Sequence, residues 1–400
     1  MTLVNKILRP RLLSEFEHIM NFWIDKSVDE KEGGFYGEVN REGVPVANAP
    51  KSVVLNARIL WTFSMAYNFL KKEEYLQMAH RAYDYIMTHC WDTQQGGLFW
   101  SVTHDGKMLD GRKQIYAQGF GIYGLSEYYV ASGKQESLDY ALELYHLIEK
   151  HSFDKEHKGY IEALSRQWQP LENMRLSAKD ANEPKSMNTH LHIIEPYTNL
   201  YRVWPDKTLA QQMHSLIRVF LDHIINQKTG HFKLFFEMDW KVKGNMISYG
   251  HDIEGAWLLC EAAEVLGDAS LIKEVQTVAL KMTDAIIHEA LAPDGSLYYE
   301  LEPDSGHLEK DRHWWPQTEA LVGFMNAWQI TGNDLYLRKM EAIWQFIDHK
   351  IIDRQHGEWF LRINEQNQPV LSDPKIGFWK CPYHNSRALM EVYRRIKNHR

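Results

Sequence analysis

Cysteine is scarce in this sequence, with only three among 400 residues, at positions 90, 260 and 381. The three lie far apart, and none belongs to a Cys-x-x-Cys motif or shows the spacing of metal ligands. Such usage speaks against the disulfide framework of a secreted scaffold. We therefore expect a chain that stays reduced.

Basic runs and long apolar runs are also missing. The formal net charge is −8 and no stretch is rich in Lys or Arg, so nucleic acid is not an expected partner. No apolar run approaches the length of a membrane span. The opening segment MTLVNKILRPRLL lacks the apolar core and cleavage site of a signal peptide. We expect a cytoplasmic protein with no membrane partner.

Tryptophan and histidine, by contrast, are plentiful, at 14 and 20 residues. Tryptophan often lines ligand and sugar clefts, although any single one can equally be a core anchor. Histidine titrates near neutral pH and can serve as an acid or a base, although a lone histidine on an apolar face is more often a core residue. Only the positions of these residues in the sequence can therefore distinguish functional residues from core residues.

One short pattern recurs six times along the chain: a glycine followed by aromatic or β-branched residues. Most copies follow a polar turn, and each is typical of a short strand or hairpin arm. Successive copies lie roughly 60–70 residues apart, which accommodates one pair of helices per repeat. The copies are GGFYGEV from Gly33, GGLFWSV from Gly96, GYIEAL from Gly159, GHFKLFF from Gly230, GSLYYEL from Gly295 and GEWFLRI from Gly357.

Two kinds of helix are expected between these copies. One is amphipathic, as in residues 8–23, and the other is apolar on nearly every side, as in residues 53–70. Six enclosed helices surrounded by six amphipathic ones predict an (α/α)6 barrel: an all-α fold of six helical hairpins, forming an inner and an outer ring, with short β-hairpin segments in the loops. We assign residues 1–400 to this single catalytic domain. The third repeat differs, because residues 165–188 resemble a long loop, and long loops in compact domains are usually functional.

Unusual residues occur near the start of every inner helix. In such a barrel these helices run in the same direction, so their N-terminal ends meet at one mouth. Each residue alone has a plain structural explanation, but convergence from six helices favours a shared pocket. The set comprises Arg58; Tyr116 and Gln118; Asn188, His190, His192 and Glu195; His251 and Glu254; His313, Trp314, Trp315 and Glu319; and Trp379 and His384.

Proton transfer on a sugar is one chemistry that fits this pocket. An epimerase or isomerase removes a proton next to a carbonyl, which requires an acid, a base and a cation for the developing enediolate. Histidines suit the first two roles, and Arg58 suits the third. Glu195 and Glu254 each stand three residues after a histidine, a spacing that favours carboxylates that orient those histidines.

Three other classes are left as alternatives. A glycoside hydrolase needs two carboxylates facing each other across the scissile bond. A metal site could use the His-x-x-Glu pairs in HLHIIE and HDIE, but no further ligand set is evident, and we expect no metal. A non-catalytic binding module is the alternative outside the enzymes. The carboxylates available to a hydrolase are Asp180, Glu195, Glu254 and Glu319.

Four segments of the sequence resemble the cellobiose 2-epimerases of the N-acylglucosamine 2-epimerase superfamily. They are KSMNTHLHIIEPYTNLYRVW, SYGHDIEGAWLL, RHWWPQTEAL and GFWKCPYHNSRALMEVY, and GHDIE is the most specific part. The resemblance covers nearly the whole chain. It implies an (α/α)6 barrel that interconverts glucose and mannose at the reducing end of β-1,4-linked disaccharides, typically cellobiose, lactose or mannobiose, without metal or other cofactor.

The resemblance also implies roles for individual residues. His192 and His384 would be the two catalytic acid–base groups, and His251 would assist ring opening and closure, with Glu254 orienting or charging it. Arg58 would hold a cis-enediolate. Of the neighbours His190 and His192, the spacing to GHDIE favours the second. Substrate binding would fall to Tyr116, Ser177, Asp180, Asn188, Trp314, Trp315 and Trp379.

Several points stay open at the level of sequence. An N-acylglucosamine 2-epimerase or an aldose–ketose isomerase acting on a monosaccharide is the nearest alternative. The preferred disaccharide, a side reaction to a ketose, and which histidine takes the proton in the forward direction are not resolved. We expect a monomer whose partner is the small-molecule disaccharide.

Overall fold

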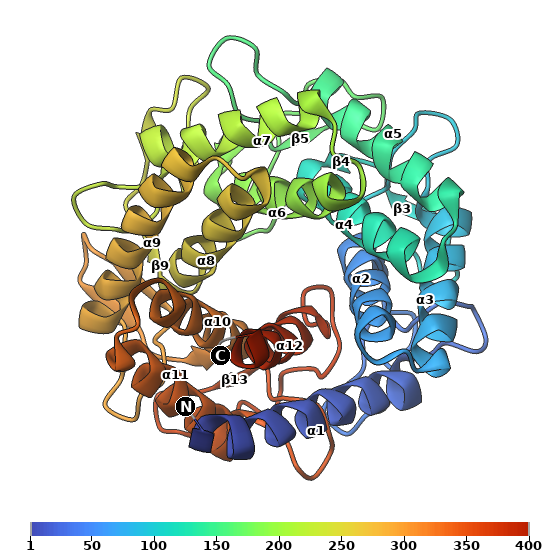
Figure 1. The fold of residues 1–400 in the computed structure, drawn as a ribbon. Helices are drawn as coiled ribbons and strands as arrows, with labels where there is room; N and C mark the ends of the chain where they lie inside the picture. The colour runs from blue at the N-terminus through green and yellow to red at the C-terminus, as the bar shows by residue number, and fades with distance from the viewer. Residues whose placement is uncertain (1, 399–400) are drawn as a thin grey trace.

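A computed structural model describes residues 2–398, and its twelve α-helices form two concentric rings (Figure 1). Each inner helix packs against the next, and the last closes the ring against the first. The predicted (α/α)6 barrel is confirmed. The inner helices are α2 (Val53–Leu70), α4 (Ile115–Ser132), α6 (Met187–Val203), α8 (Tyr249–Leu266), α10 (Trp314–Thr331) and α12 (Tyr383–Asn398). The outer helices are α1 (Thr2–Ser27), α3 (Glu73–Tyr85), α5 (Gln135–His151), α7 (Lys207–Val219), α9 (Ala269–Glu289) and α11 (Asp334–Phe346).

The two rings bury different amounts of side chain, as their sequences predict. The outer helix α1 buries one stripe, including Leu12, Phe16 and Trp23, and leaves polar residues outside. The inner helix α2 is buried without interruption from Val53 to Ala66. Burial of the apolar stripe between the rings is what stabilises helices of this length. Among the helices of residues 2–398, none combines the length and apolarity of a membrane span.

Short antiparallel strands join successive repeats at one end of the barrel. Strands β1, β4, β6, β9 and β12 each lead directly into an inner helix, and each pairs with a strand of the following repeat. The register Lys51↔Val102 between β1 and β2 is an example. The strands are β1 (Lys51–Ser52), β2 (Ser101–Val102), β3 (Met108–Asp110), β4 (Lys113–Gln114), β5 (Ala163–Leu164), β6 (Lys185–Ser186), β7 (Phe235–Phe236), β8 (Val242–Lys243), β9 (Ile247–Ser248), β10 (Glu300–Glu302), β11 (His307–Glu309), β12 (Arg312–His313) and β13 (Arg362–Ile363).

The six glycine-containing segments form one equivalent turn in each repeat. Each turn is closed by a single antiparallel bridge, and the glycines that permit it include Gly97 and Gly159, with φ of +72° and +74°. Side chains rarely tolerate that backbone region, which explains the recurring glycine. The bridges are Val28–Phe35, Trp91–Leu98, Phe153–Tyr160, Ile225–Phe232, Leu291–Leu297 and Ile352–Trp359.

Four of these turns carry a buried lysine–aspartate pair, which we call the turn pairs. In each, the aspartate also accepts backbone N–H groups of its own turn, as Asp29 does from Lys31 and Glu32 at 3.1 and 3.0 Å. Each aspartate is thereby matched by a lysine and by fixed amide donors, and Asp92 is also bonded to Arg166. The turn pairs are Asp29–Lys51 (2.8 Å), Asp92–Lys113 (3.1 Å), Asp154–Lys185 (2.7 Å) and Asp353–Lys375 (2.8 Å).

Candidate active site

The fourth residue of four inner helices is polar and holds the turn before its helix. Its side chain accepts a hydrogen bond from a turn backbone N–H, and for His190 the donor is Tyr160 at 2.8 Å. The other nitrogen of His190 lies 2.6 Å from the Ser186 carbonyl oxygen, so both ring nitrogens are engaged. Burial lowers the pKa of His190 to about 3. The remaining three residues are Gln118, bonded to Leu98, Asp252, bonded to Phe232, and Gln317, bonded to Leu297.

The position of the fourth residue in these helices explains which other residues reach the barrel axis. An α-helix rotates by about 100° per residue, so the sixth residue points about 200° away from the fourth, toward the axis. His190 and Asp252 therefore belong to the scaffold, and His192 and Glu254 belong to the centre. The sixth residues of α2, α4, α6, α8 and α10 are Arg58, Phe120, His192, Glu254 and Glu319, whereas in α12 it is the fifth residue, Arg387, that contacts this group.

The guanidinium of Arg387 joins three buried carboxylates at the centre. One terminal nitrogen donates to Glu195, and the other lies 2.7 Å from both Glu254 Oε1 and Glu319 Oε1. The phenol of Tyr383 also donates to Glu195. We call Arg387, Glu195, Glu254 and Glu319 the central cluster. Sequence reasoning missed Arg387 and Tyr383; the signal was three acidic residues predicted in one apolar pocket, which require a cation.

The central cluster has more negative than positive charge, and the pKa values reflect this. Burial raises the pKa of Glu195, but the charges of Arg387 and His192 outweigh that effect and hold it at about 2. Burial, reinforced by the charge of Glu319, raises the pKa of Glu254 to about 7. Burial likewise raises the pKa of Glu319. Glu254 therefore exchanges a proton near neutral pH, and its Oε2 has no hydrogen-bond partner among the described residues.

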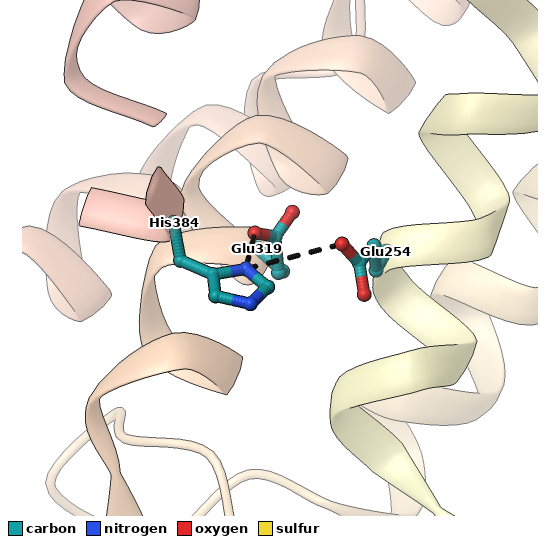
Figure 2. A group of neighbouring side chains, drawn as sticks. All are labelled: Glu254, Glu319 and His384. Atoms are coloured by element: carbon teal, nitrogen blue, oxygen red, sulfur yellow. Dashed lines mark hydrogen bonds and ion pairs between the residues drawn. The ribbon is translucent and has the colours of Figure 1, made fainter. Parts of the chain in front are cut away.

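His384 lies against two members of the central cluster (Figure 2). Its Nδ1 is 2.7 Å from Glu319 Oε1 and 3.9 Å from Glu254 Oε1. Burial, and then the nearby charges of Arg58 and Arg387, lower the pKa of His384 well below its usual value. Because a carboxylate can only accept, Nδ1 carries the hydrogen and Nε2 keeps a lone pair. His384 is thus a neutral base at physiological pH.

The same three side chains have the spacing of metal ligands. Ligand atoms of Glu254, Glu319 and His384 all lie within 4.8 Å of one another. However, the guanidinium of Arg387 already bridges the two carboxylates, and His384 donates its Nδ1 hydrogen to one of them. A metal ion would need the same carboxylate and imidazole lone pairs. The arrangement therefore suits the guanidinium of Arg387 better than a metal ion.

His192 is held in the same manner on the opposite side of the central cluster. Its Nδ1 lies 2.9 Å from Glu195 Oε2, so in the neutral tautomer that donates to this carboxylate the lone pair is on Nε2. The ring packs edge-on to Tyr116, with centroids 4.9 Å apart, and beside Phe120 at 5.0 Å. The i,i+3 spacing correctly predicts this histidine–carboxylate pair.

The same spacing argument is wrong for His251 and Glu254. His251 Nδ1 lies 2.7 Å from Ser248 Oγ, one turn back at the helix start. The Glu254 carboxylate instead accepts a hydrogen bond from the buried guanidinium of Arg387. The His251 ring packs on Trp315, with centroids 4.7 Å apart. Burial, and secondarily the charge of His192, lowers the pKa of His251 to about 3.

Arg58 lies within an aromatic cage beside the histidines. Its terminal nitrogen donates to the Tyr116 hydroxyl at 2.6 Å, and its guanidinium carbon lies 4.2 Å from the centre of Phe120 and 4.8 Å from that of Tyr383. Guanidinium remains charged at any physiological pH, and its Nε has no partner among the described residues. A fixed positive charge with a spare donor is thus available. The Tyr116 ring also meets Trp379 edge-on, with centroids 5.9 Å apart.

The other predicted binding residues lie toward the mouth of the barrel. Trp315 is 5.6 Å from the His384 ring and Trp314 is 6.2 Å from it. Asn188 has a buried Oδ1 with no partner among the described residues. Ser177 and Asp180 lie in the long loop of the third repeat and bond to each other, with Ser177 N donating to Asp180 Oδ2 at 2.7 Å. Among residues 2–398, the hydrogen bonds of Ser177 and Asp180 stay within this loop and do not reach the histidines.

A cavity of about 400 Å³ opens at the same mouth. Tyr299 and His313 line it and stack on each other, with centroids 3.9 Å apart. Tyr299 in turn meets Trp315 edge-on at 6.3 Å, so Trp315 lies between this cavity and the His251 and His384 rings. Lys179, the neighbour of Asp180, also lines the cavity, which brings the long loop to this entrance.

Comparisons with known proteins agree with this geometry. Residues 34–388 match the family model described as N-acylglucosamine 2-epimerase. The chain is 47% identical over 390 residues to the cellobiose 2-epimerase of Bacteroides fragilis, covering 97% of this chain and 99% of that protein. It is 40% identical to the cellobiose 2-epimerase of Dictyoglomus turgidum, over 98% and 99% of the two chains. The solved cellobiose 2-epimerase of Bacillus thermoamylovorans superposes with a TM-score of 0.93 at 38% identity, covering 98% of this chain and 100% of that one.

Proposed function

The chain belongs to the N-acylglucosamine 2-epimerase family and is a carbohydrate epimerase, and from that premise we propose that it acts on disaccharides. The reaction would interconvert glucose and mannose at C2 of the reducing-end residue of β-1,4-linked disaccharides such as cellobiose, lactose or mannobiose. Relatives at 47% and 40% identity, both cellobiose 2-epimerases, support this choice over a monosaccharide.

One observation carries the proposed mechanism: a continuous chain of contacts runs from one imidazole to the other. It passes from His192 to Glu195, to Arg387, to Glu319 and on to His384. Each ring donates its Nδ1 hydrogen to a carboxylate and keeps a lone pair on Nε2. Two such bases, held on opposite sides of one cluster, are what proton removal from one face of a carbon and return to the other requires.

The proposed reaction begins with opening of the sugar ring, in which His251 or His384 moves the protons. One of His192 and His384 then takes the proton from C2 and gives a cis-enediolate. Arg58 stabilises the developing negative charge, because its guanidinium is permanently charged and lies in a buried, low-dielectric site. Rotation about C2–C3 exposes the other face to the second histidine, which takes a proton from solvent on Nε2 and delivers it to C2, while the first histidine releases the abstracted proton to solvent.

The carboxylates of the central cluster act through the histidines in this scheme. When His384 accepts a proton it becomes a buried cation, and Glu319 at 2.7 Å stabilises that charge. Glu195 does the same for His192. Glu254, with its pKa near 7, can take up or release a proton as the charge beside it changes.

We assign substrate contacts to the residues around this centre. Tyr116 and Asn188 offer polar groups next to His192, and indole faces can stack on the apolar faces of pyranose rings. Ser177 and Asp180 would meet the second sugar, because their loop reaches the mouth cavity. The indoles in question are Trp314, Trp315 and Trp379.

A hydrolase is disfavoured by the position of the carboxylates. Glycoside hydrolysis needs two carboxyl groups separated across the bond, about 5–10 Å apart, with space between them. Here Glu195, Glu254 and Glu319 all bond to the single guanidinium of Arg387. Each of the three therefore has at least one oxygen bonded to that cation.

Incubation with cellobiose in D2O, read by NMR, tests the proposal. We expect deuterium at C2 of the reducing end and formation of glucosyl-mannose, without release of monosaccharide. Replacing His192 or His384 by Ala should lower kcat at least about a hundredfold, the usual contribution of a general base. Full activity of His192→Ala, or release of free glucose by the wild type, would contradict the assignment.

A further inference from the structure

Helix α6 departs from helical geometry at the residue to which we assign proton transfer. His192 has φ −90° and ψ 16°, inside a helix that otherwise continues from Met187 to Val203. Four residues later stands Pro196, which has no N–H. The carbonyl oxygen of His192 therefore lacks its usual helical donor, and the proline ring crowds it away from the helix axis. The kink follows from this one proline.

The freed carbonyl lies against the neighbouring inner helix at a glycine. A Cβ atom placed on Gly119 of α4 would sit far inside van der Waals contact of the His192 carbonyl oxygen, and 3.5 Å from Pro196 Cγ. Gly119 has ordinary helical geometry, so no unusual φ explains the glycine. The reason is close approach: α4 leaves a notch that the displaced carbonyl fills, where weak Cα–H···O contact is available.

The same notch determines where the imidazole points. Phe120, the residue after Gly119, packs on the His192 ring, and Tyr116, one turn earlier, packs edge-on to it. On the other side, Glu195 holds Nδ1 from within the kinked turn. Backbone and ring of His192 are thus fixed by the same short segment of α4. A shift of the carbonyl out of the notch would carry the ring with it.

We propose that Gly119 and Pro196 are positioning residues, which set the backbone of His192 so that its Nε2 reaches the reacting carbon. This inference rests on the proposed function, because it assumes that His192 transfers a proton. Neither residue touches the substrate in this scheme. Their contribution is the ångström-scale placement on which proton transfer between fixed groups depends.

Gly119→Ala tests the notch, and Gly124→Ala is its matched control. Gly124 lies on the same helix, and a Cβ there would approach the Ala57 carbonyl oxygen of α2 to 2.8 Å, away from His192. Both variants should lose some thermal stability. We expect only Gly119→Ala to lower kcat, by about 10- to 100-fold, with KM little changed. Equal losses of kcat in the two variants would show a general packing effect and overturn the proposal.

Solvent exchange at C2 adds a readout that a packing defect would not move. If each histidine serves one epimer, Gly119→Ala should still exchange the C2 hydrogen of the epimer that faces His384, because abstraction and return there need only that base. Exchange from the other epimer, and epimerisation itself, should fall together. Equal exchange from both epimers in the variant would overturn the positioning role. No exchange in the wild type would instead contradict the proposed function.

Pro196→Ala provides a second, milder variant for the case in which Gly119→Ala folds poorly. Alanine restores an N–H four residues after His192, so the carbonyl can return to the helix and leave the notch. Gly119→Ala should then lower kcat by a smaller factor in the Pro196→Ala variant than in the wild type. Fold-losses in kcat that simply multiply would show that the two residues act independently, against the proposal.

Discussion

The turn pairs and the central cluster bury charge in opposite ways. In the turn pair of Asp154, one lysine meets one aspartate, and the remaining lysine donors are satisfied by backbone: Lys185 bonds to Asp154 at 2.7 Å and to two carbonyl oxygens at 2.7 and 2.8 Å. In the central cluster, one guanidinium serves three carboxylates. The turns are balanced, and the centre has a surplus of acid.

This difference separates charges that support the fold from charges that can react. Burial acts to raise the pKa of Asp154, but the lysine and the turn amides outweigh it, so the aspartate stays ionised. For Glu254 burial and a neighbouring carboxylate act together and bring the pKa to about 7. A group that titrates near neutral pH can exchange protons with its surroundings, and an ionised, fully bonded one cannot.

Removing the cation of the central cluster should have the largest effect. Arg387→Met leaves three buried carboxylates without their partner, which typically costs about 3–5 kcal/mol when a buried charge loses its counterion. The folded-state pKa values of these groups then rise, so the loss is greatest at neutral pH and shrinks as the pH falls toward 4.5. Urea unfolding at several pH values measures it. Arg387→Lys, which keeps the charge, should lose less stability. Equal losses of stability in the two variants, independent of pH, would contradict this account.

Breaking a turn pair should reduce stability by a smaller amount and leave catalysis intact. Lys185→Met removes the partner of Asp154 and two backbone hydrogen bonds, and we expect about 2–3 kcal/mol of destabilisation. The double variant with Asp154→Asn should recover part of that loss. Below the unfolding temperature, kcat should stay within twofold of wild type. A loss of kcat as large as that of a histidine variant would remove the distinction between the two regions.

Glu254→Gln should change stability with the opposite sign, and only at neutral and alkaline pH. Because the pKa of Glu254 is raised from its ordinary value to about 7, the folded wild type binds an extra proton between those pH values, and its stability declines as the pH rises through that window. Glutamine does not titrate. Its advantage should therefore grow to about 3 kcal/mol above pH 7 and vanish near pH 4. Thermal unfolding at pH 5 and pH 8 compares the two, and a pH-independent difference would refute the shift.

Much of the architecture could be predicted from the sequence, because its repeat is encoded locally. The glycine segments are needed for turns with positive φ, and the contrast between amphipathic and enclosed helices sorts the two rings. The turn pairs escaped prediction. Asp92 and Lys113 look like ordinary surface residues in a polar segment, and only their common position in each repeat distinguishes them.

The site was predictable to the level of its residues and not of their contacts. Helical spacing brought His192 and Glu195 together correctly, since both lie on one helix. It failed for His251 and Glu254, because the choice of partner was made by Arg387 on another helix. Local spacing cannot anticipate competition from a residue more than a hundred positions away. Aligning the inner helices on their fourth residue would have selected Ala388 in α12, so helical register alone does not identify Arg387.

The order of the elements along the chain has a consequence for synthesis. Helices α6, α8 and α10 deliver all three acids of the central cluster, and the arginine that neutralises them arrives with α12, which also closes the ring against α2. A nascent polypeptide that has emerged only as far as α10 therefore holds uncompensated acid along its lumen. Such an intermediate is expected to remain open and hydrated, so that assembly of the reactive centre and completion of the ring become one event.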